Sequence, residues 1–259
     1  MDLQIEGQTA FVTAGAHGIG EAIANLLAQE GAKVIVADRD EAALQEKASR
    51  WAGVVAADLA SADGVDKAIS AVLKAFGEAP DIVVNNLGVG NAASFEDISD
   101  EQWYSSFAVN LMGTIRTCRS LMPAMLKRGS GAVVNIGSDL AKQPEQTLMD
   151  YGVFKAGLLY LTKALAKQYV PHVRVNAVLP GPVWSQMWTR PGGLVDQIMA
   201  NYGADRDESI KRFLEERYMP LGIGMPDDIA HAVVFLASPL AKFITGANID
   251  VGGTLRGLI

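Results

Sequence analysis

The sequence contains few of the residues on which disulfides, metal centres and hydrolytic triads depend. Only one of its 259 residues is a cysteine, Cys118, which excludes an internal disulfide. The three histidines, at positions 17, 172 and 231, fall in separate segments and form neither a ligand cluster nor part of a hydrolase nucleophile motif. We therefore expect no metal centre, and we interpret Cys118 as an ordinary buried thiol.

Long hydrophobic runs and basic runs are also missing. No apolar run approaches the ~18 residues that a membrane span requires, and the start of the chain lacks the basic and then apolar segment of a secretion signal. A formal net charge of -7 without a basic run argues against general nucleic-acid binding. We expect a soluble, cytoplasmic protein that acts on small molecules.

The hydrophobic content of 49% is sufficient, at this length, for one sizeable core. Short apolar, β-prone runs alternate with segments whose apolar residues recur every three or four positions, which predicts alternating strands and helices. The predicted strands are residues 8–13, 33–37, 54–57, 81–84, 131–136, 173–179 and 246–251. This order is typical of a single α/β domain, residues 1–259, with a Rossmann-type doubly wound parallel sheet of about seven strands and helices on both faces.

Residues 184–219 depart from this alternation. A patch rich in aromatic residues and methionine is followed by Pro191-Gly192-Gly193 and by two short amphipathic stretches, 194–202 and 207–218. We interpret the segment as a helical lid over a substrate, with a surface insertion that packs on a neighbouring molecule as the alternative. Its tryptophans, Trp184 and Trp188, favour a partly apolar or ring-bearing substrate.

A tyrosine and a lysine four residues apart suggest a proton-transfer centre. Residues 151–168 are predicted to form a helix, which places Tyr151 and Lys155 one turn apart on one face. A phenol titrates near ~10 and needs ~4 kcal/mol of stabilisation of its anion to act as a base at neutral pH. Two unit charges ~4 Å apart supply about that energy at an effective dielectric near 20. Lys155 and an oxidised nicotinamide ring are therefore expected to lower the pKa of Tyr151, although chance also places such pairs on helices.

The first predicted strand leads into a glycine-rich turn and then a helix over residues 21–29. Glycines in the sequence Ala14-Gly15-Ala16-His17-Gly18-Ile19-Gly20 let the backbone approach a pyrophosphate, whose charge the free amides of the helix start can bind. Asp38, at the end of the second strand, can accept hydrogen bonds from a ribose and favours NAD over NADP. Arg39 is the opposing signal, because a guanidinium can pair with a 2′-phosphate. Asp38 can also cap the helix predicted over residues 41–48.

Polar residues follow three further strands at the edge where open α/β sheets bind ligands. Asp58 either reaches an adenine edge or caps the helix of residues 61–76, and the sequence leaves both possibilities open. Asn85 and Gly88 follow the fourth strand, and Ser138 follows the fifth, where a hydroxyl could bind a substrate oxygen.

A long helix is predicted over residues 99–127, beginning with a capping box of Ser99 and Gln102. Asn110 and Gly113 lie in its middle, where both residue types are unfavourable. Asn110 therefore calls for a functional explanation.

With these residues in place, the whole chain resembles the short-chain dehydrogenase/reductase family. The resemblance rests on residues in the family's order and spacing: Thr13, Gly18-Ile19-Gly20, Asp58-Leu59, Asn85-Asn86, Gly88, Asn110, Ser138, Tyr151, Lys155, Asn176, Pro180-Gly181 and Phe243-Ile244-Thr245-Gly246. The chain departs from the family pattern at Ala14, which stands where the first glycine is usual, and at Leu87, Gly137 and Val251-Gly252-Gly253-Thr254.

The resemblance implies a role for each matching residue. Tyr151 would be the acid/base, Lys155 would bind the nicotinamide ribose and acidify Tyr151, and Ser138 would hold the substrate oxygen. Asn110 would anchor a proton-relay water. The resemblance also implies contacts from Val183 and Ser185 to the nicotinamide carboxamide, and a homotetramer built through the helices around Asn110 and Tyr151.

The sequence therefore predicts an NAD-linked oxidoreductase that interconverts a secondary alcohol and a ketone by hydride transfer. The predicted catalytic residues are Asn110, Ser138, Tyr151 and Lys155. The predicted cofactor-binding residues are Gly15, His17, Gly18, Ile19, Gly20, Asp38, Arg39, Asp58, Leu59, Asn85, Gly88, Tyr151, Lys155, Pro180, Val183 and Ser185. The predicted substrate-binding residues are Ser138, Leu140, Met149, Tyr151, Trp184 and Trp188.

Two alternatives stay open at this point. One is an NADPH-dependent reductase of 3-oxoacyl thioesters carried by acyl carrier protein, against which Asp38 argues. The other is a dinucleotide-sensing binding protein, which would be expected to lose the tyrosine or the lysine of the motif.

Overall fold

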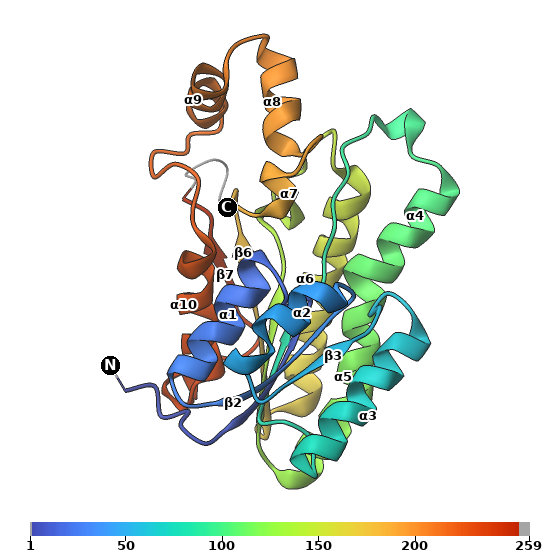
Figure 1. Cartoon of the computed structure of the whole chain (residues 1–259), viewed down its shortest axis with the longest axis vertical. Helices are drawn as coiled ribbons and strands as arrows, with labels where there is room; N and C mark the ends of the chain where they lie inside the picture. Colours follow the sequence, from blue (N-terminus) through green and yellow to red (C-terminus); the bar gives the residue numbers. More distant parts are fainter. Residues whose placement is uncertain (1, 254–259) are drawn as a thin grey trace.

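A parallel sheet of seven strands runs through the centre of the computed structural model, which describes residues 2–253 (Figure 1). The strands are β1 Thr9–Thr13, β2 Lys33–Asp38, β3 Gly53–Ala56, β4 Ile82–Asn85, β5 Gly131–Ile136, β6 Val173–Pro180 and β7 Asn248–Val251. Their order across the sheet is β3-β2-β1-β4-β5-β6-β7, and every neighbouring pair is parallel. The order reverses between β1 and β4, which is where such sheets form a ligand crevice at their carboxyl ends.

Helices cover both faces of the sheet, which explains why the central strands are almost continuously apolar. The helices α1 Gly18–Gln29, α2 Glu41–Lys47 and α10 Pro226–Ala237 pack on one face with the core residues of β1 and β2. The helices α3 Ala62–Phe76, α5 Gly113–Arg128 and α6 Met149–Tyr169 pack on the other face. The predicted doubly wound α/β fold is confirmed, with strand ends shifted by one or two residues.

The helical run predicted over residues 99–127 is divided in three. The helix α4 Asp100–Phe107 begins with the predicted capping box of Ser99 and Gln102, and a π-helical segment, Ala108–Met112, separates it from α5. The π-helical segment contains Asn110, whose side chain is fully buried. Such wide turns in helices often occur at functional sites, in agreement with the unusual position of an asparagine there.

Two aspartates do not cap the helices that follow them. The N-cap of α2 is Asp40, whose side chain accepts a hydrogen bond from the Ala43 amide, while Asp38 ends β2. The N-cap of α3 is Ser61. The capping role considered for Asp38 and for Asp58 is therefore wrong, because a serine or aspartate closer to each helix satisfies its first amides.

Residues 184–219 form the helices α7 Gln186–Thr189, α8 Leu194–Tyr202 and α9 Arg206–Glu216, which stand above the carboxyl ends of the strands (Figure 1). We call this segment the lid. It has a small core of its own, with Trp188, Val195, Ile198, Phe213 and Met219. Within residues 2–253, no helix has the length and hydropathy to cross a bilayer. Thr254, part of the departure from the family ending, lies outside the described residues.

Candidate active site

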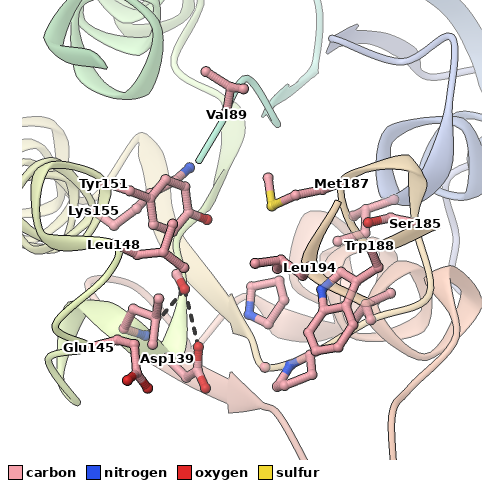
Figure 2. Close-up of a pocket in the computed structure, with 18 of the residues that line it drawn as sticks. Val89, Asp139, Glu145, Leu148, Tyr151, Lys155, Ser185, Met187, Trp188 and Leu194 are labelled. Atoms are coloured by element: carbon pink, nitrogen blue, oxygen red, sulfur yellow. Dashed lines mark hydrogen bonds between the residues drawn. The ribbon is translucent and has the colours of Figure 1, made fainter. Parts of the chain in front are cut away.

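A cavity of about 620 Å³ lies between the carboxyl ends of the strands and the lid. One wall carries Tyr151 and Lys155 from α6, and Met187, Trp188 and Leu194 from the lid lie across from them (Figure 2). The hydroxyl of Tyr151 points into the space between these two walls (Figure 2). The sheet edge, α6 and the lid therefore enclose one site.

Lys155 is fixed in the interior by backbone carbonyls. Its side chain is 2% exposed, and its ammonium donates hydrogen bonds to the carbonyls of Ile136 at 2.8 Å and Leu87 at 3.3 Å. Burial lowers the pKa of Lys155 to about 8. Since an ammonium has three N–H groups, these two described bonds leave one for a ligand hydroxyl. Gly88 allows this arrangement, because a Cβ there would lie 3.0 Å from the lysine nitrogen.

The protein by itself raises the pKa of Tyr151, whereas the expected fall counted a bound oxidised nicotinamide ring together with Lys155. Burial raises it to about 12, a hydrogen bond with Ser138 acts against this rise, and the charge of Asp139 adds to it. The ammonium of Lys155 lies 5.5 Å from the centre of the tyrosine ring and is directed at backbone carbonyls. In the protein alone, the cost of burying a phenolate therefore dominates, and Tyr151 is neutral and carries its proton at neutral pH.

Ser138 is hydrogen-bonded to an aspartate that the sequence reading did not single out. Its Oγ donates to Oδ1 of Asp139 at 3.1 Å and accepts from the amide of Leu140 at 3.2 Å. Burial raises the pKa of Asp139 to about 6, and the bond from Ser138 acts in the opposite direction. Asp139 directly follows Ser138 and lines the cavity, so its adjacency to a predicted catalytic residue was the available signal.

Asn110 holds the backbone that follows β4. Its Oδ1 accepts from the Val89 amide and its Nδ2 donates to the Val89 carbonyl, both at 3.0 Å. The Nδ2 also donates to Ser106 at 3.1 Å. The side chain of Asn110 therefore positions residues 88–90 beside Tyr151 and Lys155, while its link to a relay water stays a prediction.

The turn between β1 and α1 fits a pyrophosphate. Ala14 adopts a φ of 50°, so the turn keeps a left-handed residue although alanine replaces the glycine of the family pattern. A Cβ on Gly20 would approach the Ala14 carbonyl to 2.3 Å. His17, the N-cap of α1, makes no side-chain capping bond, which leaves the first amides of the helix for a ligand. Ala14, His17 and Ile19 line the cavity, and the residues present thus fit a dinucleotide.

Asp38 lies beside this turn. Its Oδ2 accepts from the Ala16 amide at 3.1 Å and its Oδ1 from the Asp40 amide at 3.0 Å. The carboxylate keeps further lone pairs for a ribose hydroxyl. Arg39 is exposed, and Asp58 accepts a hydrogen bond from the Ala60 amide at 3.0 Å.

Half of the predicted site residues line the cavity. Those that line the cavity are His17, Ile19, Gly88, Ser138, Leu140, Tyr151, Lys155, Pro180, Val183, Ser185 and Trp188. Those that the structure places outside its lining are Gly15, Gly18, Gly20, Asp38, Arg39, Asp58, Leu59, Asn85, Asn110, Met149 and Trp184. Four residues of the second group, Leu59, Asn85, Met149 and Trp184, were predicted to bind cofactor or substrate, but other residues line the cavity in their place.

Asn85 and Leu59 belong to the interior behind the sheet edge. The Nδ2 of Asn85 donates to Oδ1 of Asn135 at 2.8 Å, and Leu59 is 3% exposed among core residues. Asn86 lines the cavity instead, and its Nδ2 donates to the Ala14 carbonyl at 2.8 Å. Because successive residues of a strand face opposite sides, the sequence found the right strand end but named the neighbour.

The predicted substrate residues separate in the same way. Leu148 lines the cavity in place of Met149. Trp184 packs edge-to-face on Trp188 at 6.1 Å, and its ring lies 5.4 Å from the guanidinium carbon of Arg206 on another side of the lid. Only Trp188 of the two tryptophans therefore faces the cavity.

An ion pair joins the lid to the loop that precedes α6. Nη2 of Arg217 donates to Oε2 of Glu145 at 2.8 Å, and both residues line the cavity. Neither was singled out in the sequence, because residues 72 positions apart share no local pattern. Within residues 2–253, no group of histidine, cysteine, aspartate and glutamate is arranged to hold a metal ion.

A glycine turn that fits a dinucleotide, a tyrosine that points into the cavity beside a buried lysine, and a lid over the cavity define a nicotinamide-dependent oxidoreductase. Residues 13–254 match the family model described as enoyl-(acyl carrier protein) reductase. The chain belongs to the short-chain dehydrogenase/reductase family, and it is an enzyme that acts on CH–OH groups.

Three relatives illustrate the range of the family. The D-threitol dehydrogenase of Mycolicibacterium smegmatis is 33% identical, with 97% of this chain and 94% of the relative covered. The 3-oxoacyl-[acyl-carrier-protein] reductase of Aquifex aeolicus is 34% identical, with 98% and 99% covered. L-sorbose reductase from Gluconobacter frateurii, whose crystal structure is complexed with NADPH and L-sorbose, has 31% sequence identity to this chain. The two structures match over 100% of each chain, with a TM-score of 0.92.

Proposed function

We propose that this enzyme uses NAD(H) to interconvert a secondary alcohol and a ketone, with Tyr151 as the general acid/base. The observation that carries the proposal is the phenol of Tyr151, whose hydroxyl points into the cavity (Figure 2), with a hydrogen bond to Ser138 and with the fixed ammonium of Lys155 near its ring. A bound nicotinamide would supply the hydride acceptor or donor.

The residues of the chain would handle the proton. In ketone reduction, the neutral phenol of Tyr151 donates its proton to the substrate oxygen, and its pKa of about 12 keeps that proton in place until then. Ser138 holds the same oxygen. Lys155 donates its remaining N–H to a ribose hydroxyl of the cofactor, and its charge favours the phenolate in alcohol oxidation.

The dinucleotide would lie along the turn after β1. We assign its pyrophosphate to the amides of Gly18, Ile19 and Gly20 at the start of α1. Val183 and Ser185 line the cavity at the end of β6 and would contact the carboxamide. Asn85 and Leu59, both directed into the core, are not part of this proposal.

NAD is proposed over NADP because of Asp38. Its carboxylate is held beside the turn by the amides of Ala16 and Asp40, where it would accept bonds from ribose hydroxyls and repel a 2′-phosphate. Arg39 is exposed and could pair with a 2′-phosphate, which would offset this repulsion. The related L-sorbose reductase forms a complex with NADPH. Both cofactors therefore belong in the test.

A homotetramer is part of the proposal. Tyr104 of α4 and Val153 and Tyr160 of α6 are exposed, with Tyr104 71% and Tyr160 80% accessible. Large apolar side chains on the two helices around Asn110 and Tyr151 support association through them. Light scattering after size-exclusion chromatography measures the mass, and a monomer at micromolar concentration would contradict this part.

The test is the near-ultraviolet absorbance of the reduced nicotinamide. The enzyme is mixed with NAD or NADP and a panel of secondary alcohols, and with the reduced cofactors and ketones that include a 3-oxoacyl thioester. We expect alcohol-dependent NAD reduction. Turnover of the thioester with NADPH alone would favour the acyl-carrier-protein reductase, for which the Aquifex aeolicus relative is the specific support.

A further inference from the structure

The substrate end of the cavity has two chemically different walls. Met187, Trp188 and Leu194 of the lid present apolar surface on one side, while Asp139 and Glu145 present carboxyl groups on the other side, below Tyr151 and Leu148 (Figure 2). Asp139 belongs to the turn after β5, and Glu145 belongs to the loop that precedes α6. A ligand that fills this end must satisfy carboxylates on one side and pack against apolar side chains on the other.

The polar wall has unused capacity for hydroxyl donors. Asp139 accepts hydrogen bonds from Ser138 through Oδ1 and from the nearby backbone amides of Leu140 and of Asp139 itself, and Glu145 accepts one from Arg217 through Oε2. Glu216, on the last turn of α9, takes one from the hydroxyl of Tyr202 at 2.6 Å. An ionised carboxylate has about four acceptor positions, so each of the three can accept further O–H donors.

The charge at this end disfavours anionic ligands. Three carboxylates, of Asp139, Glu145 and Glu216, line it together with two arginines. Arg217 is paired with Glu145, and Arg190 donates to the amide oxygen of Asn91 at 3.1 Å. Both guanidinium groups are thus engaged with other residues, and a carboxylate or phosphate placed beside Asp139 and Glu145 would lie next to like charges.

A simple apolar alcohol is also a poor match. The hydrocarbon chain of such an alcohol would displace water from the carboxyl groups of Asp139 and Glu145 and would offer no hydrogen bonds in exchange. This loss costs free energy, because buried polar groups need hydrogen-bond partners. The indole of Trp188 is held in place by edge-to-face contacts with Phe213 at 5.6 Å and Trp184 at 6.1 Å. Its face suits the C–H side of a molecule whose hydroxyls point toward the other wall.

We propose that the substrate is a small, neutral, polyhydroxylated molecule, a polyol in oxidation or a ketose in reduction. Asp139, Glu145 and Glu216 accept its hydroxyls, and Trp188 packs on its carbon chain. This inference rests on the proposed function, because it names the substrate class of the same site. It replaces the interpretation of an apolar or ring-bearing substrate, which counted Trp184 as part of the cavity wall.

The first experiment compares three six-carbon compounds that differ only in their polar groups. Sorbitol, hexan-2-ol and gluconate are assayed with NAD and with NADP. We expect kcat/KM for sorbitol to exceed that for hexan-2-ol by at least about 100-fold, because a site built to bind hydroxyls rejects analogues that lack them. Gluconate should also be poor, because its carboxylate meets the acidic wall. Preference for hexan-2-ol or for gluconate overturns the inference.

The second experiment separates recognition from the structural role of the ion pair. Glu145→Gln should lower kcat/KM for sorbitol about tenfold, mainly through KM, and narrow the gap between sorbitol and gluconate. It should change kcat/KM for hexan-2-ol less than about twofold. Glu215→Gln is the control for the change from glutamate to glutamine, because Glu215 is an exposed glutamate of α9 that lies outside this cavity. An equal fall for sorbitol and hexan-2-ol means that Glu145 only holds the lid, and contradicts its assigned role.

Binding is measured independently of turnover. The rise in Tm with NADH and sorbitol is compared with the rise with NADH and hexan-2-ol, and we expect the larger shift with sorbitol. A larger shift with hexan-2-ol contradicts the inference even if no turnover is detected. If no alcohol or ketone changes the nicotinamide absorbance while sorbitol still raises Tm, the proposed function fails and the recognition of polyols stands.

Discussion

The hydroxyl of Ser138 donates a hydrogen bond to Oδ1 of Asp139 across 3.1 Å, and burial makes this carboxyl group harder to ionise. A hydrogen bond with Ser138 also acts against the rise that burial causes in the pKa of Tyr151. One serine hydroxyl therefore interacts with both Asp139 and Tyr151.

Asp139→Asn should stabilise the protein more at neutral than at acidic pH. The pKa of Asp139 is raised from 3.8 to about 6, so the folded state holds the proton more tightly and loses stability as pH rises from 3.8 to 6. Above that window the full penalty of roughly 3 kcal/mol applies, and below it the penalty vanishes. Urea unfolding at pH 4 and pH 7 measures the difference.

Asp66→Asn, on the exposed face of α3, is the control for Asp139→Asn, because it removes the same charge from the surface. The stability gain of Asp139→Asn should grow between the two pH values, while that of the control should not. Gains of equal size at both pH values would show that the aspartate is not destabilised by burial.

Asp38→Ala should change the choice of cofactor. Removal of the carboxylate beside the Ala16 amide takes away both the acceptor for a ribose and the repulsion of a 2′-phosphate. We expect the KM for NAD to rise about tenfold or more, with a far smaller change for NADP. Steady-state kinetics with both cofactors measures this, and an equal change in both constants refutes the assignment of Asp38.

Asn85→Ala should affect stability and spare the cofactor. Its amide donates at 2.8 Å to Asn135, which in turn donates at 2.9 Å to the hydroxyl of Thr162, all within the interior. Loss of one donor leaves a buried oxygen of Asn135 unpaired, which costs about 1–3 kcal/mol. Urea unfolding should show this loss while the KM for NAD stays within about twofold. A higher KM without loss of stability would place Asn85 in the cofactor site.

Trp188→Ala and Trp184→Ala should separate the two faces of the lid. Trp188 lines the cavity, whereas Trp184 packs behind it under the guanidinium of Arg206. We expect Trp188→Ala to raise the KM for the alcohol about tenfold or more, and Trp184→Ala to change it less than about threefold. If both variants have the same KM as the parent enzyme for every substrate tested, these residues do not form a substrate lid.

The sheet and its helices could be predicted because local patterns carry them. The apolar runs and the capping box of Ser99 and Gln102 each have a period or spacing that the structure keeps. The glycine turn and the segment Tyr151–Lys155 were equally visible, since each occupies a few successive residues.

The features of the site that the sequence did not predict depend on the direction of side chains and on contacts between residues far apart in the chain. The sequence shows that strand β4 ends in two asparagines, but only packing shows that Asn86 faces the cavity and Asn85 the core. The pair of Glu145 and Arg217 depends on how the lid folds back. The expected fall in the pKa of Tyr151 counted the charges of Lys155 and of a bound oxidised nicotinamide ring, while the burial that raises this pKa in the protein alone depends on packing that the sequence does not show.

The rate of alcohol oxidation by Tyr151→Phe, with NAD binding followed in parallel, tests the central claim most directly. The variant keeps the ring and removes the hydroxyl that we propose transfers the proton, so we predict a loss of at least about 100-fold in kcat with nearly unchanged NAD affinity. A variant that keeps more than a few per cent of the parent rate would show that the proton does not pass through Tyr151.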